Sequence, residues 1–151
     1  MYENPVIEKT GNTVAKLPLV AAVIALVGLA DSIYLTTKHF SGGQVPCSLI
    51  TGCEQVLTSS YAEIAGVPLA LFGAAAYFIV FSMAILAAFG NRLMWTLFGV
   101  QVVFMSLFTL WLVYLQAFVI EAFCQFCLLS TATTGALLFI FIVSKFLYRR
   151  D

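Results

Sequence analysis

Hydrophobic residues follow one another along this chain in four long runs, separated by short polar segments. The runs are Leu17–His39, Pro68–Gly90, Leu93–Phe118 and Ala122–Tyr148. Each run is long enough to cross the apolar core of a bilayer as an α-helix, which takes about 20 residues. The pattern therefore predicts an all-α membrane protein, built as a bundle of four transmembrane helices.

The polar segments set the predicted organisation around these helices. We interpret residues 1–16 as a cytoplasmic tail and residues 17–148 as one four-helix transmembrane domain, with an outer loop over residues 40–67. In that loop Thr51 and Glu54 have the spacing of a capping box. They predict a short helix over about residues 53–62, which would lie on the membrane surface as a lid over the bundle.

Composition supports the lipid bilayer as the surroundings of this chain. Hydrophobic residues make up 62% of it and charged residues only 9%, whereas a soluble domain is about one quarter charged. The formal net charge is zero and no basic patch is present. We therefore expect no nucleic acid among the partners.

The few basic residues predict which side of the membrane each loop faces. The two terminal segments and the short turn between the second and third runs carry six of the seven Lys and Arg residues: Lys9, Lys16, Arg92, Lys145, Arg149 and Arg150. The opposite side carries only Lys38. Basic residues concentrate on the cytoplasmic side, so we expect a multi-pass protein of the bacterial inner membrane whose outer loop faces the periplasm. The ER membrane is the alternative.

Four cysteines are the reactive groups of the chain, and all fall on the predicted outer side. Cys47 and Cys53 lie in the outer loop, and Cys124 and Cys127 form a Cys-x-x-Cys at the start of the fourth helix. A helix N-terminus favours the thiolate form of a cysteine. Two dithiols on the same side of the membrane can exchange electrons with each other. The alternatives are a structural disulfide in the loop, two free cysteines in a membrane helix, and a zinc site. The Cys-x5-Cys spacing and an oxidising compartment argue against zinc.

Four other residues are candidates for a binding site. Asp31 lies inside the first run, where an ionisable residue is a functional-site hypothesis by default. Its possible roles are proton transfer, an ion pair with Lys38, and a contribution to helix packing or folding. Tyr114 and Phe123 lie near the outer interface, as membrane anchors or as the walls of a pocket for a flat ring. Ser59 lies toward the end of the predicted lid segment, where the residues alone favour local hydrogen bonding in a turn over a binding role.

Three stretches resemble the bacterial branch of the vitamin K epoxide reductase family. The first runs from Gly28 to His39, in the first helix. The second runs from Cys47 to Gly73 and includes the loop cysteines, the serine at Ser59 and the sequence Gly66-Val67-Pro68. The third is Tyr114-Leu-Gln-x-Phe-Val-Ile-x-x-Phe-Cys-x-x-Cys127. The resemblance covers about residues 18–145, in the family's order.

The resemblance implies a fold and an electron path. A four-helix bundle would surround a quinone of the ubiquinone, menaquinone or vitamin K type. Cys47 would form the mixed disulfide with a thioredoxin-like (DsbA-like) redox protein, Cys53 would attack Cys124, and Cys127 would pass electrons to the quinone. Ser59 aligns with the family's serine near the quinone, and we add Asp31, Tyr114 and Phe123 as expected quinone contacts.

The expected activity is that of a quinone-dependent thiol-disulfide oxidoreductase that supports disulfide-bond formation. Many bacterial relatives carry a fused thioredoxin-like domain after a fifth helix. The sequence ends at Asp151, so the partner is expected on a separate chain unless this sequence is an excerpt. Two alternatives remain at this point. One is a vitamin K epoxide or quinone reductase of the same fold, and the other is a small four-helix transporter with structural disulfides.

Overall fold

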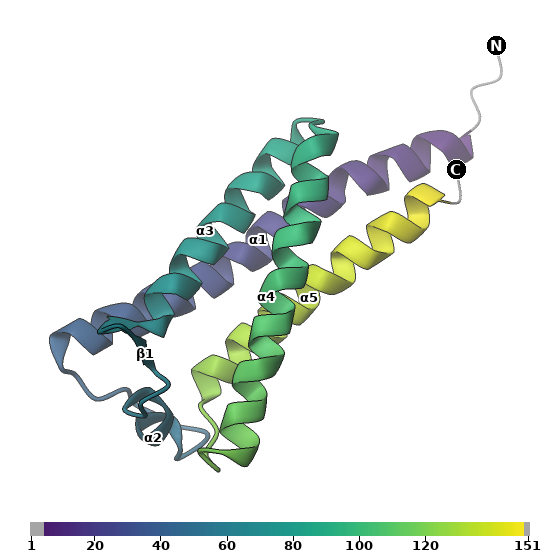
Figure 1. Ribbon diagram of the computed structural model, residues 1–151. Coiled ribbons are helices and arrows are strands. Elements are labelled where there is room, and N and C mark those ends of the chain that lie inside the picture. Colours follow the sequence, from purple (N-terminus) through teal and green to yellow (C-terminus); the bar gives the residue numbers. More distant parts are fainter. Residues whose placement is uncertain (1–4, 150–151) are drawn as a thin grey trace.

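The structure is a computed structural model that describes residues 5–149, with side chains described from Lys16 onward. It confirms the predicted four-helix bundle. The long helices are α1 (Pro5–Ser41), α3 (Leu69–Ala88), α4 (Arg92–Phe118) and α5 (Gln125–Arg149). The short elements are α2 (Cys53–Leu57) and the strands β1 (Glu63–Ile64) and β2 (Val67–Pro68). Figure 1 shows α2 and the hairpin at one end of the bundle, opposite the start of α1 and the end of α5.

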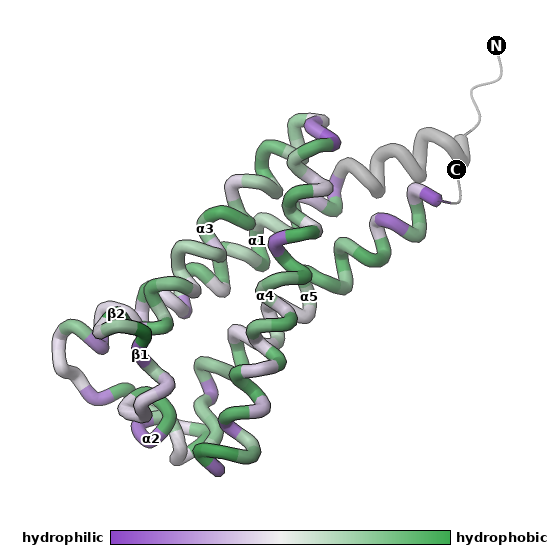
Figure 2. The backbone as a smooth tube through the Cα atoms, viewed as in Figure 1, coloured by the Kyte–Doolittle hydropathy of each residue, from purple (hydrophilic) through white to green (hydrophobic). Residues whose placement is uncertain are grey.

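The four spans agree with the hydropathy prediction to within a few residues. The part of α1 that is apolar enough to cross a membrane begins at Lys16, but its backbone is helical from Pro5. The predicted tail is therefore largely a continuation of the first helix, and its residues 1–4 lie outside the described residues. Hydrophobic residues cover the spans along their length (Figure 2). The chain is a multi-pass membrane protein.

Each long helix packs on two neighbours. α1 packs on α3 and α5, and α4 packs on the same two helices. Small residues allow this close approach: Ala21, Ala22 and Ala25 of α1 are buried, and a Cβ added to Gly28 would collide with the ring of Tyr77. The helices α1 and α3 therefore approach each other closely along this contact.

The hydroxyl group of Tyr77 connects α3 to α5. Its oxygen lies 2.9 Å from the carbonyl oxygen of Ser130, 2.7 Å from Thr133 Oγ1 and 2.8 Å from Thr134 Oγ1. Ser130 Oγ lies 2.9 Å away as a fourth neighbour. A phenolic hydroxyl donates once and accepts from two partners, so it can bond to three of these four oxygen atoms at a time. This polar cluster was not predicted from the sequence.

The outer loop corrects two predictions. The lid helix ends at Leu57 instead of continuing to about residue 62, and the capping box is wrong because Gly52 is the N-cap residue and no side chain makes a cap hydrogen bond. Residues 63–68 of the remaining loop form the β1–β2 hairpin. Its turn residues Ala65 and Gly66 have φ angles of 54° and 80°, and two positive φ values are what a two-residue type I′ turn requires.

The hairpin is attached to α1 by a contact between two polar side chains. His39 Nε2, near the end of α1, lies 3.1 Å from Glu63 Oε1 in β1. The amide of Leu69 also donates to the carbonyl of Ala62 at 2.8 Å. The outer loop is thereby held against the end of the bundle on which α2 sits.

Candidate redox and ligand site

Two cysteines from distant parts of the chain share one buried cluster at the outer end of the bundle. Cys53 and Cys124 both have an exposed fraction of 0% and pack with Val56 and Ala122. Cys47 and Cys127 pack against the same cluster. We call this set the thiol cluster. It brings together all four cysteines that the sequence singled out.

The two pairs in the thiol cluster differ in oxidation state. Cys47 and Cys53 form a disulfide with their Cα atoms 6.2 Å apart, within the usual range for such a bond. Cys124 and Cys127 are free thiols, and Cys127 is the less buried of the two. A disulfide beside a dithiol is the arrangement that thiol-disulfide exchange needs.

Backbone contacts hold α2 against the segment that leads into α5. A Cβ added to Gly52 would lie 2.7 Å from the carbonyl oxygen and 2.9 Å from the nitrogen of Phe123. Only glycine allows the two backbones to come this close. The backbone amide of Leu49 also donates to Gln125 Oε1 at 3.1 Å. The loop pair therefore packs directly against the Cys-x-x-Cys segment.

A buried glutamine supports the Cys-x-x-Cys segment from α4. Gln116 is only 4% exposed. Its Oε1 accepts from the amide of Cys124 at 3.3 Å, and its carbonyl accepts from the amide of Ala122 at 3.2 Å. Sequence analysis missed Gln116, because these partners come from the far side of a chain reversal at Glu121, whose φ angle is 54°.

Cys124 directly precedes α5, as the sequence predicts for the first cysteine of the motif, although the helix begins at Gln125 and not at Ala122. The Cys127 thiol donates a hydrogen bond that lowers the pKa of Cys124 to about 7. Burial opposes this shift, and the negative charge of Asp31 opposes it more weakly. Cys124 is thus readily ionised, which suits it both to attack a disulfide and to leave from one.

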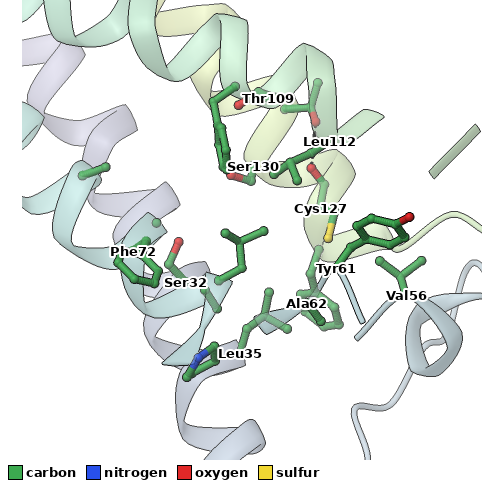
Figure 3. Close-up of a pocket in the computed structure, with 18 of the residues that line it drawn as sticks. Ser32, Leu35, Val56, Tyr61, Ala62, Phe72, Thr109, Leu112, Cys127 and Ser130 are labelled. Carbon is green, nitrogen blue, oxygen red and sulfur yellow. Dashed lines mark hydrogen bonds between the residues drawn. The ribbon is translucent and has the colours of Figure 1, made fainter. Parts of the chain in front are cut away.

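A cavity of about 400 Å³ opens between the helices next to the thiol cluster. Its walls come from all four spans and the outer loop. Figure 3 shows Cys127 on one wall, with its sulfur directed into the cavity, and Ser32, Leu35 and Phe72 across from it. The volume falls within the range of small-molecule sites.

Two of the four predicted ligand contacts line this cavity and two do not. Asp31 and Ser59 are among its lining residues, and the Ser59 hydroxyl donates to the Val56 carbonyl at 2.7 Å. Tyr114 lies outside the lining and packs on Phe118 with ring centroids 5.1 Å apart. Phe123 is also outside it, and contributes its backbone to the contact with Gly52.

Asp31 has no polar partner among the described residues. It is 8% exposed, and neither carboxylate oxygen has a hydrogen-bond partner there. The pairing with Lys38 is not formed, since the Lys38 ammonium lies 5.7 Å from the centroid of the Tyr34 ring instead. A buried polar group without a partner is costly, and this one faces the cavity.

The cavity suits a mostly apolar ligand that also carries polar atoms. Leu35, Phe72 and Leu112 supply apolar surface, whereas Asp31 and Ser130 supply polar groups. Ser130 was not predicted as a site residue, because its position on the inner face of α5 depends on helix rotation. Among the described residues, no group of three or more His, Cys, Asp or Glu side chains is placed to hold a metal ion.

Comparison with known protein families agrees with this geometry. The model of the vitamin K epoxide reductase family matches residues 19–142. The matched region contains the four spans almost completely, the outer loop and the entire thiol cluster.

Proposed function

The chain belongs to the vitamin K epoxide reductase family, and from that premise we propose that it is a membrane thiol:quinone oxidoreductase that supports disulfide-bond formation. It would take electrons from a thioredoxin-like partner through Cys47 and Cys53. It would pass them to Cys124 and Cys127 and then to a bound quinone. The observation that carries this proposal is the burial of Cys53 beside Cys124 in one cluster.

The relay starts with an attack of a partner thiolate on Cys47, which releases Cys53 as a thiolate. Cys53 then attacks Cys124 in the oxidised Cys124–Cys127 disulfide, so that a Cys53–Cys124 bond forms and Cys127 is released. When Cys47 is freed by the partner's second thiol, it attacks Cys53 and restores the loop disulfide. Cys124 and Cys127 are then both free thiols and the loop cysteines are again disulfide-bonded, as they are in the structure.

The final transfer takes place at Cys127, whose sulfur faces the cavity. A quinone bound there takes up two electrons and two protons. Oxidation of Cys124 and Cys127 to a disulfide supplies both, so the reaction balances without another reductant. Asp31 and Ser59 are the predicted residues that we propose to contact the ring, together with Ser130. The mostly apolar walls would exclude water from the transfer.

The distribution of basic residues indicates on which side of the membrane the relay operates. Six of the seven Lys and Arg residues belong to the two terminal segments or to the turn between α3 and α4. By the positive-inside rule, this supports a position of the cysteines outside the cytoplasm. Disulfides persist in such compartments. We therefore propose the periplasmic face of a bacterial inner membrane as the location of the thiol cluster.

The test is quinone reduction by purified protein in lipid, with a reduced thioredoxin-like protein as the electron donor. Ubiquinone, menaquinone, vitamin K and its epoxide are compared as acceptors. We expect reduction of at least one quinone, and its loss in Cys127→Ala. Turnover of the epoxide alone would instead assign the epoxide reductase activity. Unchanged turnover in Cys127→Ala would show that the proposal is wrong.

A further inference from the structure

We propose that Asp31 is a catalytic residue that relays the protons of the thiol pair to the quinone oxygens. This inference rests on the proposed function, because it assigns a proton path to the same transfer. It goes beyond that function by giving the buried carboxyl of α1 a chemical role separate from ring binding.

Three observations carry the inference. Asp31 is 8% exposed, and both of its carboxylate oxygens lack a hydrogen-bond partner among the described residues. It lines the same cavity as Cys127, so a ring that fills the cavity contacts both. The carboxyl also lies close enough to Cys124 for its ionisation state to influence the pKa of that thiol.

The alternative roles of Asp31 find no support in its contacts. A carboxyl that held helices together would bond to a neighbouring helix, as Tyr77 does with the hydroxyl groups of α5. Asp31 makes no such bond among the described residues. An intramembrane carboxyl that faces a cavity and lacks a structural partner is typical of proton-transfer sites.

The proposed step balances. As the Cys124–Cys127 bond forms, the two thiols release two electrons and two protons, and the quinone becomes a quinol by taking up both. The Asp31 carboxyl gives a proton to a quinone oxygen and recovers one from the pair, and it repeats this for the second proton. Asp31 ends in the form in which it started, so no further reactant is required.

The other titratable groups of the cavity are less suited to this role. The lining contains His39, Tyr61 and Tyr77 besides Asp31 and Cys127. His39 is engaged by Glu63, and the Tyr77 hydroxyl is engaged by α5. Tyr61 lies in the outer loop and is 48% exposed, so its proton exchanges with the exterior instead of being confined to the cavity.

The first experiment replaces Asp31 by Asn, which has nearly the same shape and carries no transferable proton. We expect quinol formation from the prereduced pair to be about 100-fold slower. Quinone affinity and exchange between the two cysteine pairs should stay within about threefold of the wild type. Asp31→Glu should recover part of the rate. The matched control is Thr36→Val, another buried polar residue of α1 that does not line the cavity.

Wild-type rates of quinol formation in Asp31→Asn would overturn the inference and leave the proposed function intact. Loss of quinone binding in that variant, with normal quinol formation at saturating quinone, would make Asp31 a binding residue only and would also overturn it. If the wild type reduces no quinone, the proposed function itself is wrong.

A second experiment avoids dependence on the folding of the Asn variant. The sequence contains only two aspartates, Asp31 and Asp151. In an Asp151→Asn protein, a ¹³C label on the aspartate carboxyl therefore reports on Asp31 alone. Because Asp31 returns to its starting form, we record time-resolved infrared spectra during quinone reduction and expect a transient carboxyl band that shifts with the label. Complete reduction of the quinone without any transient labelled carboxyl band would overturn the inference.

Discussion

The backbone of Gly52 packs directly against the backbone of Phe123, so that a Cβ at residue 52 would lie 2.7 Å from the Phe123 carbonyl oxygen. This contact joins the residue before Cys53 to the residue before Cys124. The side-by-side burial of these two cysteines depends on it, because α2 is only five residues long and its disulfide leads only to Cys47 of the same loop.

Replacing Gly52 by Ala should slow the exchange between the two cysteine pairs. The added methyl group has to push α2 away from residues 122–123, and a displacement of about 1 Å can cost up to about 100-fold in a positioned reaction. Stopped-flow measurement of electron transfer from a dithiol donor to Cys124 and Cys127 checks the effect. Gly43→Ala is the control, since its Cβ would meet only side-chain atoms at 3.3 Å or more. Equal rates in both variants would contradict the account.

The ionisation of Cys124 should depend on Cys127. In a Cys47→Ser, Cys53→Ser protein, ultraviolet absorbance of the thiolate should rise with pH around a pKa of about 7. Removal of the donor in Cys127→Ala should move this rise to higher pH, because the thiolate loses its main stabilising hydrogen bond. At neutral pH the variant therefore contains less thiolate. An unchanged or lower midpoint would show that another group sets the pKa of Cys124.

Loss of the Tyr77 hydroxyl should destabilise the bundle. In Tyr77→Phe the hydroxyl groups of Thr133 and Thr134 lose their shared partner, which should lower the free energy of unfolding by about 0.5–2 kcal/mol. Denaturant titration in mixed micelles measures the difference. Tyr148→Phe is the matched control, since it removes only an exposed bond from Arg92. Equal stability of the two variants would argue against a structural role for the Tyr77 hydroxyl.

The side chain of Gln116 should stabilise the Cys-x-x-Cys segment. Gln116→Met keeps a similar shape but leaves the buried amide of Cys124 without its acceptor, a loss of about 1–3 kcal/mol. Hydrogen exchange of the Cys124 amide should speed up accordingly, while exchange in α3 should not change. Unaltered protection of Cys124 would mean that Gln116 does not hold this segment.

Long apolar runs made the four spans predictable from the sequence, since a run of about 20 apolar residues is typical of a transmembrane helix and of little else. The same uniformity hid the rotation of each helix. Tyr114 and Ser130 lie on comparably apolar segments, yet only Ser130 faces the cavity. Which side of such a helix faces inward depends on its neighbours and not on its own pattern.

The outer loop was harder to predict than the spans. Thr51 and Glu54 have the local spacing of a cap, but the close approach of Gly52 to Phe123 determines where α2 starts. That partner lies far along the sequence, as does the partner of Gln125 at Leu49. Cysteine spacing predicted the two pairs, whereas their shared burial became visible only in the structure.

The most direct test of the relay is whether Cys53 forms a disulfide with Cys124. In Cys127→Ala, the Cys124 thiolate has only the loop disulfide to attack, and Cys53 is the sulfur buried beside it. Thiol trapping in native membranes, followed by mass spectrometry of the digested protein, identifies the bond formed. The account predicts a Cys53–Cys124 disulfide with Cys47 released as a free thiol. Recovery of an intact Cys47–Cys53 disulfide with free Cys124, or of a Cys47–Cys124 bond, would contradict it.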